Sequence, residues 1–156
     1  LGPLPGDWRE PYTDMYERAL REDLTAVPGV EAALREIALP KAVASNSPRA
    51  TILRSLSTTA LTRYFHGRLV GADDVDRGKP APDAYLRAAE LLGLPPSECL
   101  AVEDSPTGVA AARAAGMRVL GFGGGLSTPQ TLRAAGADVF HSMSDLPALV
   151  ESYLDQ

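Results

Sequence analysis

The chain has 156 residues, a length that suits one α/β domain with a small appendage. Hydrophobic residues make up 45% and charged residues 22%, a composition that excludes a disordered chain. The net charge of −5 is spread along the chain and gives no sign of a nucleic-acid or membrane partner. The one cysteine, Cys99, excludes an internal disulfide and is predicted to be a core residue, so we expect a reducing, cytoplasmic setting. The oligomeric state stays unknown from the sequence.

The predicted elements begin with an amphipathic helix over residues 7–24, where apolar residues recur at helical spacing. A second, short helix runs from Val30 to Ile37, and residues 41–45 indicate a buried strand. The later elements are a helix that begins at Ser47-Pro48, a short strand over 65–70, a loop over 72–82, a helix that ends at Gly93, a strand over 99–102, a helix over 105–116, a strand over 119–122, a helix over 128–135, a strand over 138–141 and a helix over 146–153.

This alternation of strands and helices predicts a parallel sheet covered by helices on both faces. The first helix, over residues 7–24, stands outside the alternation and either packs beside the sheet or belongs to a second domain. One device occurs twice: a helix ends in Arg-Ala-Ala-Gly, at Gly116 and at Gly136, and a strand follows three residues later. We interpret it as a recurring helix–glycine–strand connection and not as a tandem repeat.

Three polar features follow predicted strands or lie in loops that reach the same edge of the sheet, where ligands of open α/β sheets bind. Ser45-Asn46-Ser47 offers a hydroxyl and free N–H groups to a phosphate oxygen, although a plain helix cap has the same sequence. Glu103-Asp104 places two carboxylates directly after a strand, where they suit Mg²⁺ or stabilise the next helix. Lys79, stiffened by Gly78 and Pro80, offers an ammonium group to a phosphoryl group, or is a solvated loop lysine.

Taken together, Ser45-Asn46, Gly78-Lys79-Pro80 and Val102-Glu103-Asp104-Ser105-Pro106-Thr107-Gly108 resemble the haloacid dehalogenase-like superfamily. The similarity is closest to its phosphoglycolate phosphatase and β-phosphoglucomutase-like branch, and it extends from about Pro28 to Phe122. The resemblance implies a three-layer, Rossmann-like α/β core with a parallel sheet. It also implies an α-helical cap, of which residues 1–27 would be the last part, and it assigns residues 28–156 to the core domain.

The same resemblance implies a role for each matching residue. Ser45 would hydrogen-bond the transferring phosphoryl group, and Asn46 beside it would add backbone or amide contacts. Lys79 would offset the negative charge of the nucleophile and the phosphoryl group. Asp104, with Glu103, would bind the cofactor Mg²⁺, and the substrate would be a small phosphorylated metabolite.

One part of the family pattern is missing from these 156 residues. The family's nucleophile is the first Asp of an Asp-x-Asp that ends a central strand, between the strands that here end at Ser45 and Asp104. The only Asp-x-Asp in the chain, Asp74-Val75-Asp76, follows no long buried strand and leads into the Lys79 loop, so we do not interpret it as the nucleophile. Without the central strand, two strand edges would lie open and the lone chain should fold poorly as a monomer. We expect residues before Leu1 to carry it; the alternatives are another segment that fills the gap, or a fragment with a rearranged fold.

The leading hypothesis is therefore a phosphatase that acts through an aspartyl-phosphate intermediate in its complete form, with this chain alone inactive. A sugar-phosphate mutase of the β-phosphoglucomutase type is the close alternative, and a catalytically inactive fragment or binding module is the alternative from another class. Other features are interpreted as structural: His66 and His141 lack a metal-ligand pattern, Gly123-Gly124-Gly125 lacks a dinucleotide-binding fingerprint, and Arg49 fits an exposed helix arginine better than a second phosphate ligand.

Overall fold

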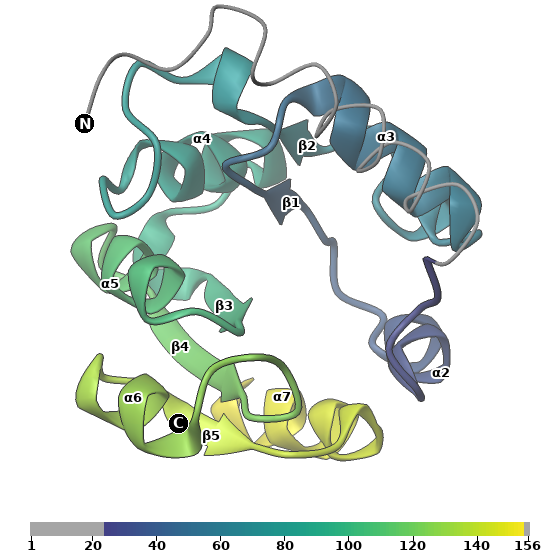
Figure 1. Ribbon diagram of the computed structural model, residues 1–156, viewed down its shortest axis with the longest axis vertical. Coiled ribbons are helices and arrows are strands. Elements are labelled where there is room, and N and C mark those ends of the chain that lie inside the picture. The colour runs from purple at the N-terminus through teal and green to yellow at the C-terminus, as the bar shows by residue number, and fades with distance from the viewer. Residues whose placement is uncertain (1–23, 155–156) are drawn as a thin grey trace, which may run out of the picture.

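The computed structural model describes residues 24–154, so the predicted helix over residues 7–24 and most of the expected cap segment lie outside the described residues. None of the helices in the described part is long and apolar enough to cross a bilayer. The helices and strands are α2 (Val30–Glu36), β1 (Val43–Ala44), α3 (Arg49–Thr58), β2 (Leu69–Val70), α4 (Asp83–Leu92), β3 (Leu100–Glu103), α5 (Pro106–Ala114), β4 (Arg118–Phe122), α6 (Pro129–Ala134), β5 (Asp138–Phe140) and α7 (Leu146–Leu154), joined by short 3₁₀ helices (Figure 1).

All strand pairs are parallel, as the sequence predicts, but they form two sheets. Strand β1 pairs with β2 through Val43 and Leu69, and the other sheet has the order β3-β4-β5. No ladder joins β1 to β3 among the described residues, although the two strands face each other across the middle of the molecule (Figure 1). The break falls between the strand before Ser45 and the strand before Asp104, where the family resemblance implies a further strand.

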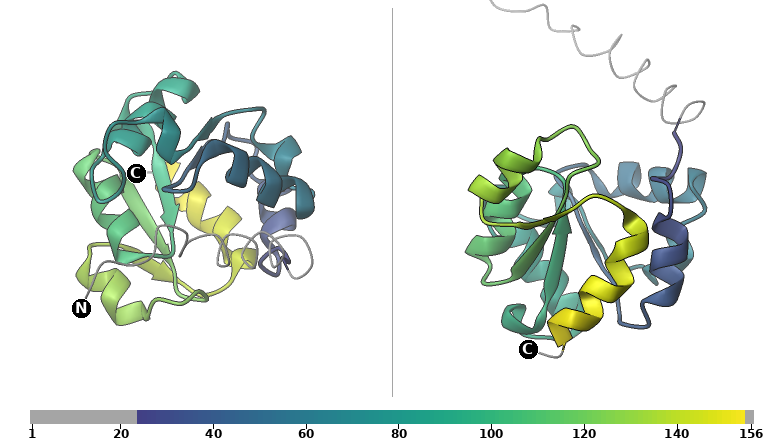
Figure 2. Two further views of the ribbon diagram at one scale, coloured as in Figure 1. Left: turned by 45° about the horizontal axis from the view of Figure 1, so that its top comes forward. Right: turned by 90° about the horizontal axis from the view of Figure 1, so that it is seen from below.

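Helices cover both faces of the sheets, which confirms the three-layer α/β architecture (Figure 2). On one face, α4, α5 and α6 form a core cluster with β3 and β4 that includes Val109, Val119 and Leu132. On the other face, α2 and α7 pack through Ala33 and Leu146 against β4 and β5. Cys99 is 8% exposed and belongs to the first cluster, so the prediction of a core cysteine is confirmed.

Strands β1 and β2 have two residues each and are shorter than the predicted strands over 41–45 and 65–70. In the second segment, the N–H of Arg68 bonds to the carbonyl of Phe65 and Gly67 has a positive φ, so a turn takes the first half of that range. The repeated helix–glycine connection is confirmed, because Gly116 and Gly136 both have positive φ, at 85° and 100°. This left-handed backbone favours glycine and ends each helix before the next strand.

Candidate active site

The five candidate residues come together at the edge of the sheets where β1 and β3 end. Ser45 follows β1 directly, and its N–H donates to the carbonyl of Val70. Glu103 is the last residue of β3, and Asp104 follows it. Because the carboxyl ends of parallel strands lie at one edge, Ser45 and Glu103, which are 58 positions apart in the sequence, belong to the same site.

Asn46 connects the end of β1 to the lysine loop. Its Oδ1 accepts from the N–H of Lys79 at 2.8 Å, and its Nδ2 donates to the carbonyl of Lys79 at 3.2 Å. The loop passes so close that a Cβ on Gly78 would lie 2.9 Å from Asn46 Oδ1. The amide of Asn46 therefore holds the Lys79 backbone, a contact that the sequence did not reveal.

Lys79 points inward and is paired. Its side chain is 10% exposed, and Nζ forms an ion pair with Oε1 of Glu103, which is 7% exposed. Nζ also donates to the hydroxyl of Tyr85 at 3.2 Å and lies 4.7 Å from the centre of its ring. Tyr85 in turn donates to Glu103 Oε1 at 2.6 Å. A buried ammonium group held in this way has a fixed position, which is what stabilising a phosphoryl group requires.

The second oxygen of Glu103 is equally engaged. Glu103 Oε2 accepts from the N–H of Asp104 at 3.1 Å, and from the N–H and the hydroxyl of Ser105 at 3.3 and 3.1 Å. The Ser105 hydroxyl also caps α5 by accepting from the N–H of Gly108 at 3.0 Å. A Cβ on Gly108 would lie only 2.1 Å from Glu103 Cδ, so this close approach of helix and carboxylate requires glycine.

These contacts set the protonation of the buried groups. Burial by itself would raise the pKa of Glu103, but the Lys79 ammonium and the hydrogen bonds from Lys79, Tyr85 and Ser105 outweigh it, and the pKa lies below its ordinary value. Burial and the neighbouring Glu103 carboxylate raise the pKa of Tyr85. Glu103 is therefore ionised at neutral pH, and the phenol of Tyr85 keeps its proton and acts as a donor.

Asp104 has a different environment from Glu103. It is exposed, and the Gly123–Gly125 loop approaches it, with a Cβ on Gly125 lying 3.5 Å from Asp104 Oδ2. Between residues 24 and 154, no three His, Cys, Asp or Glu side chains converge as a metal-binding group. Mg²⁺ is commonly bound by one or two carboxylates and completed by water and substrate phosphate, and the accessible carboxylate of Asp104 fits such a site.

Ser45 and Arg49 complete the surroundings. The hydroxyl of Ser45 accepts from the N–H of Ser47 at 3.1 Å and retains the capacity to donate. Arg49 is engaged elsewhere: its guanidinium donates to the carbonyls of Leu69 and Gly67 and so ties α3 to β2. The structural interpretation of Arg49 fits these contacts better than a phosphate ligand does.

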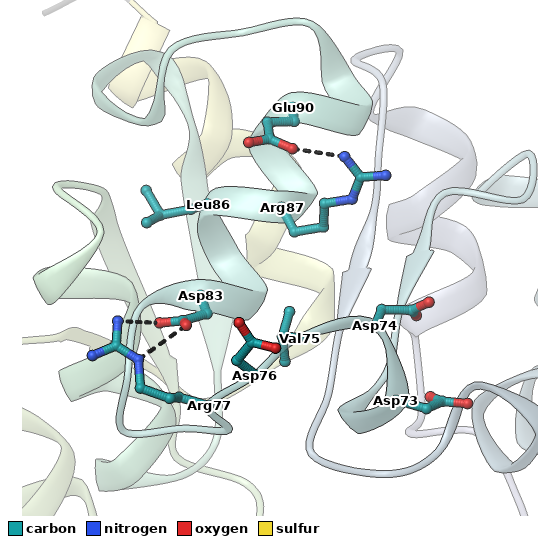
Figure 3. A pocket seen from close by; sticks show the side chains of 9 residues that line it. All are labelled: Asp73, Asp74, Val75, Asp76, Arg77, Asp83, Leu86, Arg87 and Glu90. Atoms are coloured by element: carbon teal, nitrogen blue, oxygen red, sulfur yellow. Dashed lines mark hydrogen bonds and ion pairs between the residues drawn. The ribbon is translucent and has the colours of Figure 1, made fainter.

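A separate surface hollow of about 490 Å³ contains the Asp-x-Asp sequence (Figure 3). Asp74 ends a 3₁₀ helix and accepts from the N–H of Gly71 at 2.8 Å, so no strand presents it as a nucleophile. Figure 3 shows the hollow lined by charges that pair with one another, such as Arg77 with Asp83 at 2.9 Å. These contacts make the hollow a charged surface feature, and they agree with the prediction that Asp74 is not the nucleophile.

Comparison with known proteins identifies the class. A family model described as haloacid dehalogenase-like hydrolase matches residues 4–116, and the chain therefore belongs to this family. The chain is 39% identical to hexitol phosphatase A of Escherichia coli over 114 residues, which are 70% of this chain and 51% of the relative. It is 37% identical to β-phosphoglucomutase of Mycobacterium bovis over 145 residues, which are 88% of this chain and 55% of the relative. These relatives confirm the branch that the motifs indicate.

Solved structures agree with the family. A haloacid dehalogenase-like protein from Agrobacterium tumefaciens superposes with a TM-score of 0.88 at 34% identity, over 97% of this chain and 72% of the other. A family hydrolase from Deinococcus radiodurans, solved with bound phosphate and sodium, superposes with a TM-score of 0.84 at 32% identity, over 98% of this chain and 71% of the other. The chain thus spans about half the length of the two curated relatives and about seven tenths of these two structures.

Proposed function

We propose that the chain forms the larger part of the core of a Mg²⁺-dependent phosphatase that acts on a small phosphorylated metabolite. The observation that carries the proposal is the buried Lys79–Glu103 pair, which fixes an ammonium group at the carboxyl end of β3, beside the residue that precedes Asp104. Phosphatases among the relatives support the reaction class, and the phosphate bound to the Deinococcus radiodurans hydrolase supports the ligand. Residues 1–27 are assigned to the cap and residues 28–156 to the core, in a cytoplasmic protein.

Each residue has a defined task in this proposal. The Ser45 hydroxyl donates to a phosphoryl oxygen, and Lys79 offsets the charge that the phosphoryl group carries during transfer. Asn46 acts through Lys79, because its amide holds that residue's backbone, and it also lies beside the phosphate position. The nucleophilic Asp, which would form the aspartyl-phosphate, comes from outside these 156 residues.

Asp104 is the first choice as metal ligand. Asp104 is accessible, whereas both oxygens of Glu103 already accept hydrogen bonds. We therefore assign Glu103 the task of holding Lys79. Glu103 would still lie near the metal, because it precedes Asp104 in the chain. Bound Mg²⁺ would neutralise and orient the phosphate. Lys79 and Ser45 would contact the phosphoryl group themselves.

The test is Mg²⁺ binding to the complete polypeptide, measured by calorimetry, together with Mg²⁺-dependent phosphate release by the same polypeptide. Asp104→Ala should abolish both, and Asp76→Ala, which removes an acidic residue of the charged hollow, should change neither. Retained turnover in Asp104→Ala would sink the assignment.

A sugar-phosphate mutase is the second candidate, since the β-phosphoglucomutase relative covers 88% of the chain. The core residues are shared by both activities. Product analysis separates them: free phosphate identifies the phosphatase, and an isomerised sugar phosphate identifies the mutase. The intact mass of the protein from its native source shows whether the polypeptide is longer than these 156 residues.

A further inference from the structure

The ammonium nitrogen of Lys79 carries three N–H groups, and side chains of the site engage two of them. One N–H donates to Oε1 of Glu103, and another donates to the hydroxyl of Tyr85 at 3.2 Å. Among residues 24–154, no third acceptor bonds this nitrogen. The remaining N–H is therefore the group that can donate to an incoming phosphoryl oxygen.

The hydroxyl of Tyr85 gives this third N–H a fixed direction. With Glu103 as its only partner, the end of the flexible four-carbon stem of Lys79 could pivot about the line from Nζ to Oε1, and the free N–H would turn with it. A second acceptor away from that line removes the pivot. Tyr85 also donates to Glu103 Oε1 at 2.6 Å, so each of the three groups bonds both of the others.

Tyr85 is itself firmly anchored. It lies in the first turn of α4, where its N–H donates to the carbonyl of Pro82 at 3.0 Å. Its side chain is buried in the core cluster that also contains Ala89 and Ala101. The centre of its ring lies 4.7 Å from Lys79 Nζ, so the ring contacts the ammonium group as well. The hydroxyl therefore sits at the end of a rigid ring whose position is set by the core.

We propose that Tyr85 is a positioning residue for phosphoryl transfer: its hydroxyl orients the Lys79 ammonium group so that one N–H is aimed at the phosphoryl oxygen. Tyr85 acts through Lys79 and does not contact the phosphate itself. The expected effect on turnover rests on the proposed function, whereas the orientation of Lys79 can be measured without turnover. A tyrosine with a purely structural role would contribute packing and stability, and its hydroxyl would not affect the ammonium group.

The first test is Tyr85→Phe in the complete polypeptide, with p-nitrophenyl phosphate and Mg²⁺. This variant keeps the ring and its packing and removes only the hydroxyl. The kcat of the folded fraction, quantified by circular dichroism, should fall at least about tenfold, because a misaligned ammonium group is felt mainly in the transition state. The KM should change less than about threefold.

Tyr153→Phe is a matched control. The hydroxyl of Tyr153 donates to Asp138, and the guanidinium of Arg118 lies 4.6 Å from the centre of its ring. A tyrosine, a cation and a carboxylate thus meet here too, but Arg118 and Asp138 begin β4 and β5, at the edge of the sheet opposite the site. Tyr153→Phe should change kcat less than about twofold. An equal fall of kcat in both variants would overturn the inference.

NMR of the lysine ammonium groups tests the orientation directly, and the Lys79 signal is identified by its loss in Lys79→Met. In the wild type, the ammonium protons should show a nuclear Overhauser effect to the hydroxyl proton of Tyr85, from which they are separated by one hydrogen bond. Inorganic phosphate with Mg²⁺ should shift the Lys79 signal. In Tyr85→Phe, exchange of the ammonium protons with water should be at least about fivefold faster, because one hydrogen bond is lost.

The results separate this inference from the proposed function. An absent Overhauser effect in the wild type overturns the inference even if Tyr85→Phe does not fold. Unchanged exchange in Tyr85→Phe overturns it as well, and so does faster exchange with an unchanged kcat, since the orientation would then not serve the reaction. If the wild type hydrolyses neither p-nitrophenyl phosphate nor sugar phosphates, the proposed function fails, and the ammonium measurements alone decide the role of Tyr85.

Discussion

Replacing Gly108 with Ala should disrupt the buried ion pair of the site. The new Cβ would lie 2.1 Å from Glu103 Cδ and 2.1 and 2.2 Å from its two oxygens, separations that non-bonded heavy atoms cannot keep. The carboxylate cannot move freely, because Lys79, Tyr85 and Ser105 all hold it. Either Glu103 leaves Lys79 or α5 shifts, and disruption of a buried pair costs about 3–5 kcal/mol in the free energy of unfolding.

Urea denaturation of the Gly108→Ala variant, followed by circular dichroism, measures this cost. The control is the same substitution in a background where Lys79→Met and Glu103→Ala replace the buried pair with apolar side chains. There the Cβ has room, and Gly108→Ala should stabilise the protein by about 0.5–1 kcal/mol, because alanine favours a helix more than glycine does. An equal loss of stability in both backgrounds would refute the reasoning, since the cost would then not come from the carboxylate.

Two further predictions concern the same contacts. Since the pKa of Glu103 is lowered by folding, its stabilisation is present above the unfolded pKa near 4.3 and is lost as the pH falls through the lower folded pKa. In metal-free buffer, the free energy of unfolding should therefore fall below about pH 4.3 more steeply for the wild type than for Glu103→Gln, by up to ~1.4 kcal/mol per pH unit; parallel curves would contradict this. Asn46→Ala removes two hydrogen bonds to Lys79 and should cost about 1–2 kcal/mol and speed exchange of the Lys79 amide, whereas unchanged exchange would exclude the clamp.

The sequence predicted most elements of the described fold because they depend on local signals. Ser105 and Pro106 mark the start of α5, and the glycines after α5 and α6 mark where those helices end. The lengths of β1 and β2 were overestimated, because a strand is defined by its pairing and pairing is not a local property. The break between the sheets was foreseen from the missing family strand, and not from any pattern in the residues themselves.

The site was predicted as a set of residues, but not as a network. Lys79 and Glu103 are 24 residues apart, and Asn46 and Lys79 are 33 apart, so no periodicity connects them. Tyr85 was not among the predicted site residues, although its hydroxyl bonds both members of the ion pair. A signal was available in hindsight: a tyrosine six residues after a predicted catalytic lysine, on the core side of the next helix, brings a hydrogen-bonding group into a buried position.

Helix α4 explains how the site is assembled although its residues belong to two separate sheets. Ala84 and Ala88 pack with Val70 of the β1-β2 sheet, whereas Tyr85 and Ala89 pack in the cluster of the β3-β4-β5 sheet. Adjacent positions of one helix thus bind different sheets, and the lysine loop leads directly into this helix. The hydrogen bonds from Asn46 to Lys79 and the ion pair from Lys79 to Glu103 then cross the same break at its carboxyl edge.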